Sequence, residues 1–152
     1  MLETAFSKVY TKFKLHFYRA VFGRFQAREA TLTTVETFCM ETIAALGEPT
    51  VNEFSSFVGI SPPNAAYKIN NLVQKGYVEK RQSQQDKREY HLVVTQKYID
   101  YYNISYRYLG TVMGRIKERF SPEDVAKLEE MLDVISKELM PEIPLERTRE
   151  IP

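Results

Sequence analysis

Two short helical segments separated by a tight turn restrict the fold of this chain more than any other feature. Thr50 stands three residues before a glutamate, the T-x-x-E spacing of a helix N-terminus, and the helix that follows ends at Gly59. Ser61 is the predicted N-cap of a second helix, which begins with two prolines and runs to about Lys75. Prolines are tolerated there because the first amides of a helix have no partner within it. The segment therefore predicts a helix-turn-helix.

A β-hairpin is predicted directly after the second helix. Tyr77–Arg81 and Tyr90–Thr95 are typical of strands, and the residues from Gln82 to Glu89 form a polar turn between them. A hairpin in this place is the wing of a winged helix-turn-helix, whose second helix enters the major groove of DNA. We therefore expect residues 51–95 to bind double-stranded DNA.

The helix that begins at Ser61 has an apolar and a polar face. Ala65, Ile69, Leu72 and Val73 form one stripe, which we expect to face the core. On the polar face, asparagine can bind adenine, lysine can reach guanine or phosphate, and tyrosine can pack on a thymine methyl group. Lys75 is assigned to this face as well. The predicted DNA-binding residues of the helix are Ser61, Pro63, Asn64, Tyr67, Lys68 and Asn71.

Basic residues also mark the predicted hairpin. Lys87 and Arg88 stand at its tip, where a guanidinium can enter a narrow A·T-rich minor groove, and Arg81 lies on its first strand. Asp86 is interpreted as the partner that orients Arg88, because a free carboxylate facing DNA would be repelled. A charged hairpin tip is usually only solvated. It is the combination with the helix-turn-helix that favours DNA binding.

Charge is distributed unevenly along the chain, although its total is only +1. Residues 59–91 contain six basic and three acidic residues, a net +3, and residues 121–152 contain four basic and nine acidic ones, a net −5. We therefore expect the C-terminal segment to face away from DNA.

Apolar residues recur at helical spacing in three stretches outside the motif, 6–21, 102–120 and 125–139. The first predicts a helix from Glu3 to about Arg28, and the second predicts one helix of roughly 24 residues. A shorter helix is predicted to end near Gly47. One winged domain cannot bury three such seams, so we expect a second copy of the chain to cover them.

The predicted fold class is mainly α with a small β-hairpin wing (α+β), a winged helix-turn-helix with N- and C-terminal dimerisation helices. We assign residues 1–140 to a single domain and 141–152, which contain three prolines, to a loosely ordered tail. Within the domain, 30–95 would be the DNA-binding part, and 1–28 and 96–140 the dimerisation part.

Composition disfavours several classes of protein. No stretch is apolar enough for a membrane span or a signal peptide, which predicts a cytoplasmic protein. With one cysteine and two histidines, neither an internal disulfide nor a metal site is expected. No phosphate loop or nucleophile motif is present, so we expect no enzymatic activity and no cofactor.

The sequence resembles the MarR family of bacterial winged-helix regulators over nearly its whole length. The resemblance rests on Gly59-Ile60-Ser61, Leu72, Lys75-Gly76-Tyr77-Val78, Lys80-Arg81, Asp86-Lys87-Arg88 and Val94-Thr95. It implies a homodimer that binds a palindromic operator, usually a repressor released by a small ligand or an oxidant. The sequence departs from the family pattern at Pro62-Pro63 and Lys68, so the operator sequence is not carried over.

Three further interpretations remain open at this stage. His16, Phe38, Tyr98 and Tyr101 could line a pocket for a small-molecule effector, although aromatic residues at helical spacing more often only pack. Cys39, beside Phe38 and Met40, is expected to be a buried structural cysteine, and a redox sensor is the alternative. The resemblance argues against the sensor, because peroxide-sensing members of that family carry their reactive cysteine in the first helix. The alternative function is a winged-helix protein-interaction module that does not bind specific DNA sequences.

Overall fold

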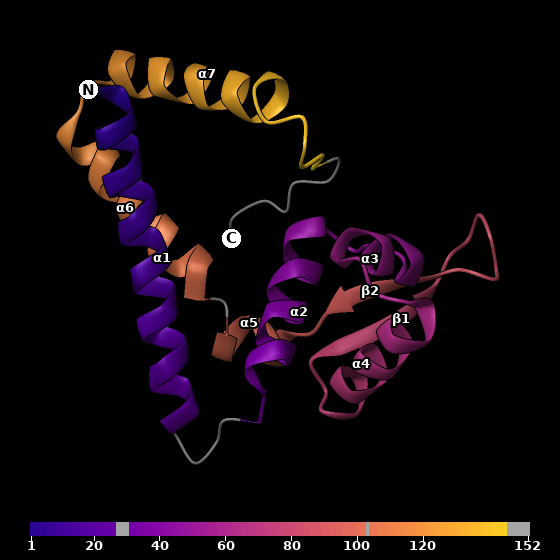
Figure 1. Cartoon of the computed structure of the whole chain (residues 1–152). Coiled ribbons are helices and arrows are strands. Elements are labelled where there is room, and N and C mark those ends of the chain that lie inside the picture. Colours follow the sequence, from indigo (N-terminus) through magenta and orange to yellow (C-terminus); the bar gives the residue numbers. More distant parts are fainter. Residues whose placement is uncertain (27–30, 103, 146–152) are drawn as a thin grey trace. The chain divides into compact units, whose positions relative to one another are not determined.

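The computed structural model describes residues 1–26, 31–102 and 104–145 and divides into two compact units (Figure 1). The winged unit comprises the described residues from Val21 to Tyr102, and the helical unit comprises Met1–Ala20 and the described residues from Ile104 onward. Seven helices and one antiparallel hairpin are found in these ranges, so the predicted fold class is confirmed.

The elements of the winged unit follow the predicted order of helix, turn, helix and hairpin. They are α2 (Thr34–Leu46), α3 (Val51–Val58), α4 (Pro62–Gln74), β1 (Val78–Gln82), β2 (Tyr90–Val94) and α5 (Gln96–Tyr102). Each strand differs by one residue from the predicted ends: β1 begins and ends one residue later, and β2 ends one residue earlier.

Side-chain caps explain why these helices begin where they do. The Thr33 hydroxyl accepts from the Glu36 amide at 3.2 Å while the Glu36 carboxylate accepts from the Thr33 amide at 2.8 Å, which is a complete capping box. Thr50 and Ser61 cap α3 and α4 as predicted, each accepting from the amide three residues on. Gly59 ends α3 with a φ of +70°, a conformation that favours glycine. The local sequence therefore determines the turn between α3 and α4.

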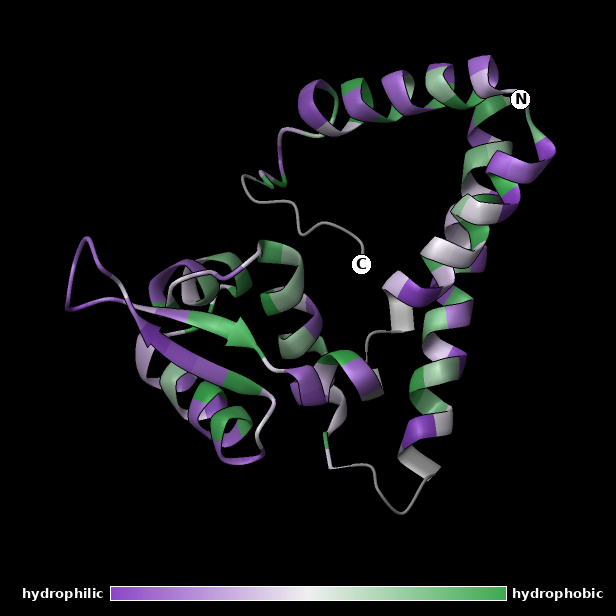
Figure 2. Ribbon diagram, turned by 180° about the vertical axis from the view of Figure 1, so that it is seen from behind, coloured by the Kyte–Doolittle hydropathy of each residue, from purple (hydrophilic) through white to green (hydrophobic). Residues whose placement is uncertain are grey.

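The hairpin is antiparallel, with Val78 opposite Val94 and Gln82 opposite Tyr90. Figure 2 shows β1 as largely hydrophilic and β2 as largely hydrophobic. Alternate residues of a strand face opposite sides. Val78 and Leu92 are buried, so the side of the hairpin that carries them faces the core.

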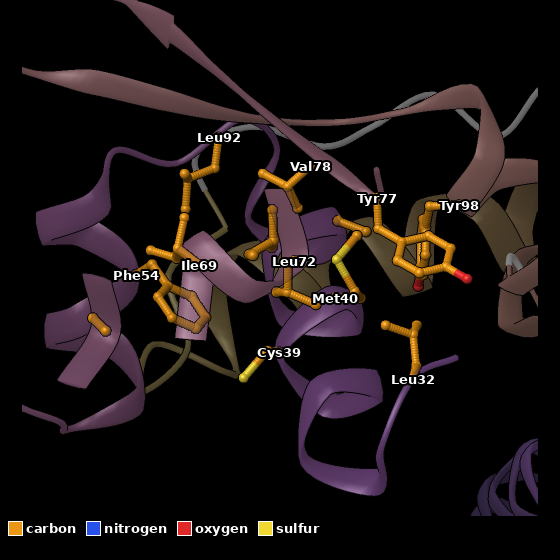
Figure 3. Close-up of a cluster of buried hydrophobic side chains, with 13 residues drawn as sticks. Leu32, Cys39, Met40, Phe54, Ile69, Leu72, Tyr77, Val78, Leu92 and Tyr98 are labelled. Atoms are coloured by element: carbon orange, nitrogen blue, oxygen red, sulfur yellow. The ribbon is translucent and has the colours of Figure 1, made fainter. Parts of the chain in front are cut away.

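A single hydrophobic cluster holds α4 against α2, α3 and the hairpin (Figure 3). Ala65, Ile69 and Leu72 are fully buried, and Val73 packs against them, which confirms the predicted inner stripe of α4. The other members are Leu32, Cys39, Met40, Ile43, Ala44, Phe54, Tyr77, Val78, Leu92 and Tyr98. This packing fixes the rotation of α4, and hence which of its residues face solvent.

The helical unit contains most of α1 (Leu2–Gln26) together with α6 (Ile104–Arg119) and α7 (Pro122–Glu138). Tyr108 contacts α1 through two rings: it stacks on His16 with centroids 3.7 Å apart and meets Phe13 edge-on at 5.5 Å. No residue of α7 is buried, and large apolar side chains remain exposed along α1 and α7.

Helices α5 and α6 cover residues 96–102 and 104–119 of the predicted 24-residue helix, and residue 103 between them lies outside the described residues. Residues 27–28 of the predicted first helix and 146–152 of the predicted tail lie outside the described residues. Residues 141–145 form a turn and coil.

Candidate nucleic-acid interface

The solvent-facing stripe of α4 consists of Pro63, Tyr67, Asn70 and Gln74, which recur at spacings of four, three and four residues. All four are exposed, and Tyr67 retains 68% of its surface. They lie opposite the fully buried Ala65, Ile69 and Leu72 because successive residues of a helix are about 100° apart. The stripe combines one aromatic ring with two amide side chains, which together can bond or pack on base edges.

This stripe is rotated relative to the face predicted from the sequence. Pro63, Asn64 and Tyr67 are exposed as expected, but Lys68 and Asn71 are only partly exposed and lie on one flank of α4. Sequence reasoning missed Asn70 and Gln74. The signal was available, because these two residues continue the spacing of Pro63 and Tyr67.

The half-buried Lys68 lies near α2. Its charge acts on the buried thiol of Cys39, whose pKa is raised by burial and lowered in part by Lys68. The net effect is a raised pKa, so Cys39 stays a neutral thiol near pH 7. The burial expected for this cysteine is confirmed. Ser61 is exposed, and its hydroxyl accepts from the Asn64 amide at 3.3 Å.

Lys75, which the sequence assigned to the polar face, contacts other parts of the winged unit. Its ammonium donates to Glu36 Oε2 and to the Thr31 carbonyl, both at 2.7 Å. Burial would raise the pKa of Glu36, but hydrogen bonds from Lys75 and from the Thr33 amide outweigh it and lower that pKa. Thr31 has a second partner, because its hydroxyl forms a hydrogen bond with the hydroxyl of Tyr77. The acidic partner comes from α2, 39 residues away, so the helical pattern of α4 could not show it.

The two basic residues of β1 lie on opposite sides of the hairpin. Lys80 shares its side with Val78, and its ammonium donates to Asn70 Oδ1 of α4 at 2.7 Å. Arg81 is exposed on the other side, opposite His91, whose ring Nδ1 lies 2.9 Å from the Glu48 carbonyl oxygen. Sequence reasoning named Arg81 and missed Lys80, although the alternation of side chains along a strand was a signal that could have separated the two.

The wing tip, Ser83–Glu89, presents Lys87 and Arg88 to solvent. The Asp86 carboxylate accepts from Arg88 Nε at 3.1 Å, from Nη2 at 3.0 Å and from the Arg88 amide at 3.0 Å. These bonds, first that of the guanidinium and then that of the amide, lower the pKa of Asp86. The Arg88 side chain remains 89% exposed. Asp86 therefore orients a cation that is still accessible to a partner.

The candidates for an effector pocket lie in different surroundings. Tyr98 belongs to the core of the winged unit, where its hydroxyl donates to Glu41 Oε1 at 2.5 Å, whereas Phe38 is exposed on α2. His16 stacks on Tyr108 in the helical unit, and the side chain of Tyr101 lies outside the described residues. Across the described part of the chain, no three metal-ligating side chains gather and no helix is long and apolar enough to cross a membrane.

Part of the winged unit matches the model of a known protein family. Residues 32–90 match the model of the MarR family, which confirms the resemblance drawn from the sequence. None of the curated proteins matches the chain.

Several solved structures share the fold at low sequence identity. FabT of Streptococcus pneumoniae, solved in complex with DNA, is 20% identical with a TM-score of 0.59, covering 93% of this chain and 97% of that one. A transcriptional regulator of Thermotoga maritima is 18% identical with a TM-score of 0.57, covering 93% and 94%. A MarR family protein of Bacillus stearothermophilus is 14% identical with a TM-score of 0.60, covering 91% and 92%.

Proposed function

We propose that this chain, which has the MarR fold and matches the model of that family over residues 32–90, is a sequence-specific DNA-binding transcriptional regulator. It acts as a homodimer on a palindromic operator. Helix α4 enters the major groove, and the wing tip reaches the adjacent minor groove.

The exposed stripe of α4 carries this proposal. Tyr67, Asn70 and Gln74 point away from the core on the helix that a winged helix-turn-helix inserts into DNA. Amide side chains can bond base edges, and a tyrosine ring can pack on a thymine methyl group. FabT, which shares the fold, was solved with DNA bound.

The charges of the winged unit support the same orientation. Arg81, Lys87 and Arg88 are exposed on the hairpin, where phosphate contacts would position the helix without specifying sequence. Residues 121–152 carry a net −5 and would be repelled by the DNA backbone.

A homodimer is proposed from the exposed apolar surface of the helical unit. Helix α7 has no buried residue, and its exposed side chains include Met131, Leu132 and Val134. Apolar patches of this kind mark association surfaces. A two-fold dimer would place two α4 helices about 34 Å apart, the spacing of successive major grooves. Deletion of residues 121–152 should therefore abolish both the dimer and tight operator binding, and a truncated chain that still binds as a dimer would exclude this arrangement.

Repression released by a small ligand is the regulatory mode that the family resemblance supports. A dimer covering an operator would exclude other proteins from that stretch of duplex.

Selection of bound duplexes from a random pool tests the proposal directly. The wild-type chain should enrich a palindromic sequence, and its affinity for random duplex should fall steeply with salt as phosphate contacts release counterions. Tyr67→Ala should then cost about 1–3 kcal/mol at one base position, whereas Tyr67→Phe keeps the ring and should keep any contact with a thymine methyl group.

The same experiment distinguishes the proposed regulator from the alternative function, a protein-interaction module. A chain that enriches no sequence and binds duplex without salt dependence is a protein-interaction module instead.

A further inference from the structure

We infer that Lys80 sets the base preference of α4 by occupying the amide oxygen of Asn70, so that this asparagine binds guanine rather than adenine. The inference rests on the proposed function and adds a specificity-determining residue to it. The observation is the 2.7 Å contact between Lys80 Nζ of the wing and Asn70 Oδ1 of α4, both on the surface.

The backbone on both sides of this contact is held by the core. Lys80 stands opposite Leu92 and two residues after Val78, both of them buried, so its side chain leaves the hairpin on the side that faces α4. Asn70 directly follows Ile69, which is fully buried. The distance between the two residues is therefore fixed by packed elements.

The chemistry of the two groups dictates their orientation. An ammonium has donors only, and an asparagine amide has one oxygen acceptor and one NH₂ donor group. Facing Lys80, Asn70 must turn its oxygen to the ammonium and its NH₂ away from it. The oxygen keeps a second lone pair, but the ammonium beside it repels the positive end of another donor, so the groups best placed for a third partner are the N–H donors of Asn70 and Lys80.

An asparagine paired with a lysine and an unpaired asparagine should bind different bases. An unrestrained asparagine binds adenine bidentately, accepting from N6 and donating to N7, and the first of these bonds needs its oxygen. Guanine presents two acceptors, N7 and O6, in the major groove. The donor pair formed by Asn70 and Lys80 matches guanine, and removal of the ammonium would restore the pattern that matches adenine.

Competitive selection from random duplexes with three proteins tests this inference. We compare the wild-type chain, Lys80→Met and the control Arg81→Met, which removes the same charge from the neighbouring residue on the opposite side of the hairpin. The wild type should enrich guanine at the position bound by Asn70. Lys80→Met should shift the ratio of guanine to adenine at this position by about tenfold toward adenine, in keeping with one bidentate contact.

The control should bind all duplexes more weakly and keep the guanine. Asn70→Ala should remove the preference at that position in both the wild-type and the Lys80→Met background. Circular dichroism melting of each variant should match the wild type, because Asn70, Lys80 and Arg81 are all exposed, and a match shows that the shift is not a folding defect.

Three results would overturn the inference. If Lys80→Met selects the same base as the wild type, the contact does not set the preference. If Arg81→Met shifts the base as strongly, the effect is one of charge. If the wild-type chain enriches no sequence at all, the proposed function fails, and the inference that rests on it fails too.

Discussion

The two ends of the hairpin use basic residues in opposite ways. At the root, Lys75 donates to Glu36 and Thr31, and Lys97 donates to the Lys75 carbonyl at 2.7 Å with its ammonium 4.5 Å from the centre of the Tyr77 ring. At the tip, the Arg88 side chain is 89% exposed, compared with 34% for that of Lys75. The root cations join parts of the chain to one another, and the tip cations remain accessible.

This difference limits what charge counting can show. The net +3 of residues 59–91 includes Lys75, which neutralises a carboxylate of α2, and Lys68, which is half-buried. The basic residues of the hairpin, Lys80, Arg81, Lys87 and Arg88, are exposed instead. Stability should therefore depend on the root lysine, and affinity for DNA on the residues of the tip.

The largest effect is expected at the root. Lys75→Met should lower the free energy of unfolding by about 2 kcal/mol, because it leaves the Thr31 carbonyl without this donor and the Glu36 carboxylate, 13% exposed, without its cation. Urea denaturation followed by circular dichroism measures this, with the replacement of an exposed lysine, Lys87→Met, as control. Equal midpoints for the two variants would show that the root contact contributes nothing.

The dependence of stability on pH provides a second test of the contact between Lys75 and Glu36. The pKa of Glu36 is lowered in the folded protein, so its contribution is present above the ordinary glutamate value of 4.5 and disappears as the pH falls through the lower folded pKa. The difference in stability between the wild type and Lys75→Met should shrink over that acid range. A difference that stays constant down to about pH 2 would rule out the ion pair as its source.

A smaller effect, on binding instead of folding, is expected at the tip. The double variant Lys87→Ala/Arg88→Ala should bind every duplex about tenfold more weakly, and the slope of log affinity against log salt should become shallower by roughly 0.9 for each phosphate that the variant no longer neutralises. Fluorescence anisotropy with a labelled random duplex measures both quantities. The unfolding midpoint of the variant should equal that of the wild type. Weaker binding to one sequence alone would instead mean that the tip contacts bases.

Local and long-range features differed in how far the sequence predicted them. The helix ends followed from Thr50, Gly59 and Ser61, because a cap is decided by residues three or four apart. The prediction of which residues of α4 face the core was also correct. The partners of two side chains were not predicted, because they come from other elements: Lys75, which follows α4, donates to Glu36 of α2, and Asn70 of α4 accepts from Lys80 of β1. A single-helix pattern contains no information about such partners.

The smallest effect tests whether orientation or charge matters at the tip. Asp86→Asn removes one negative charge, so charge alone would strengthen binding to DNA. We expect roughly threefold weaker binding instead, because Arg88 would no longer have the carboxylate that holds both Nε and Nη2, and an exposed ion pair of this kind contributes little more. Glu89→Gln, which removes the same charge from the same wing tip, is the matched control and should bind slightly more tightly. Anisotropy titrations at one salt concentration compare them, and if Asp86→Asn also binds more tightly than the wild type, Asp86 only reduces the charge of the wing.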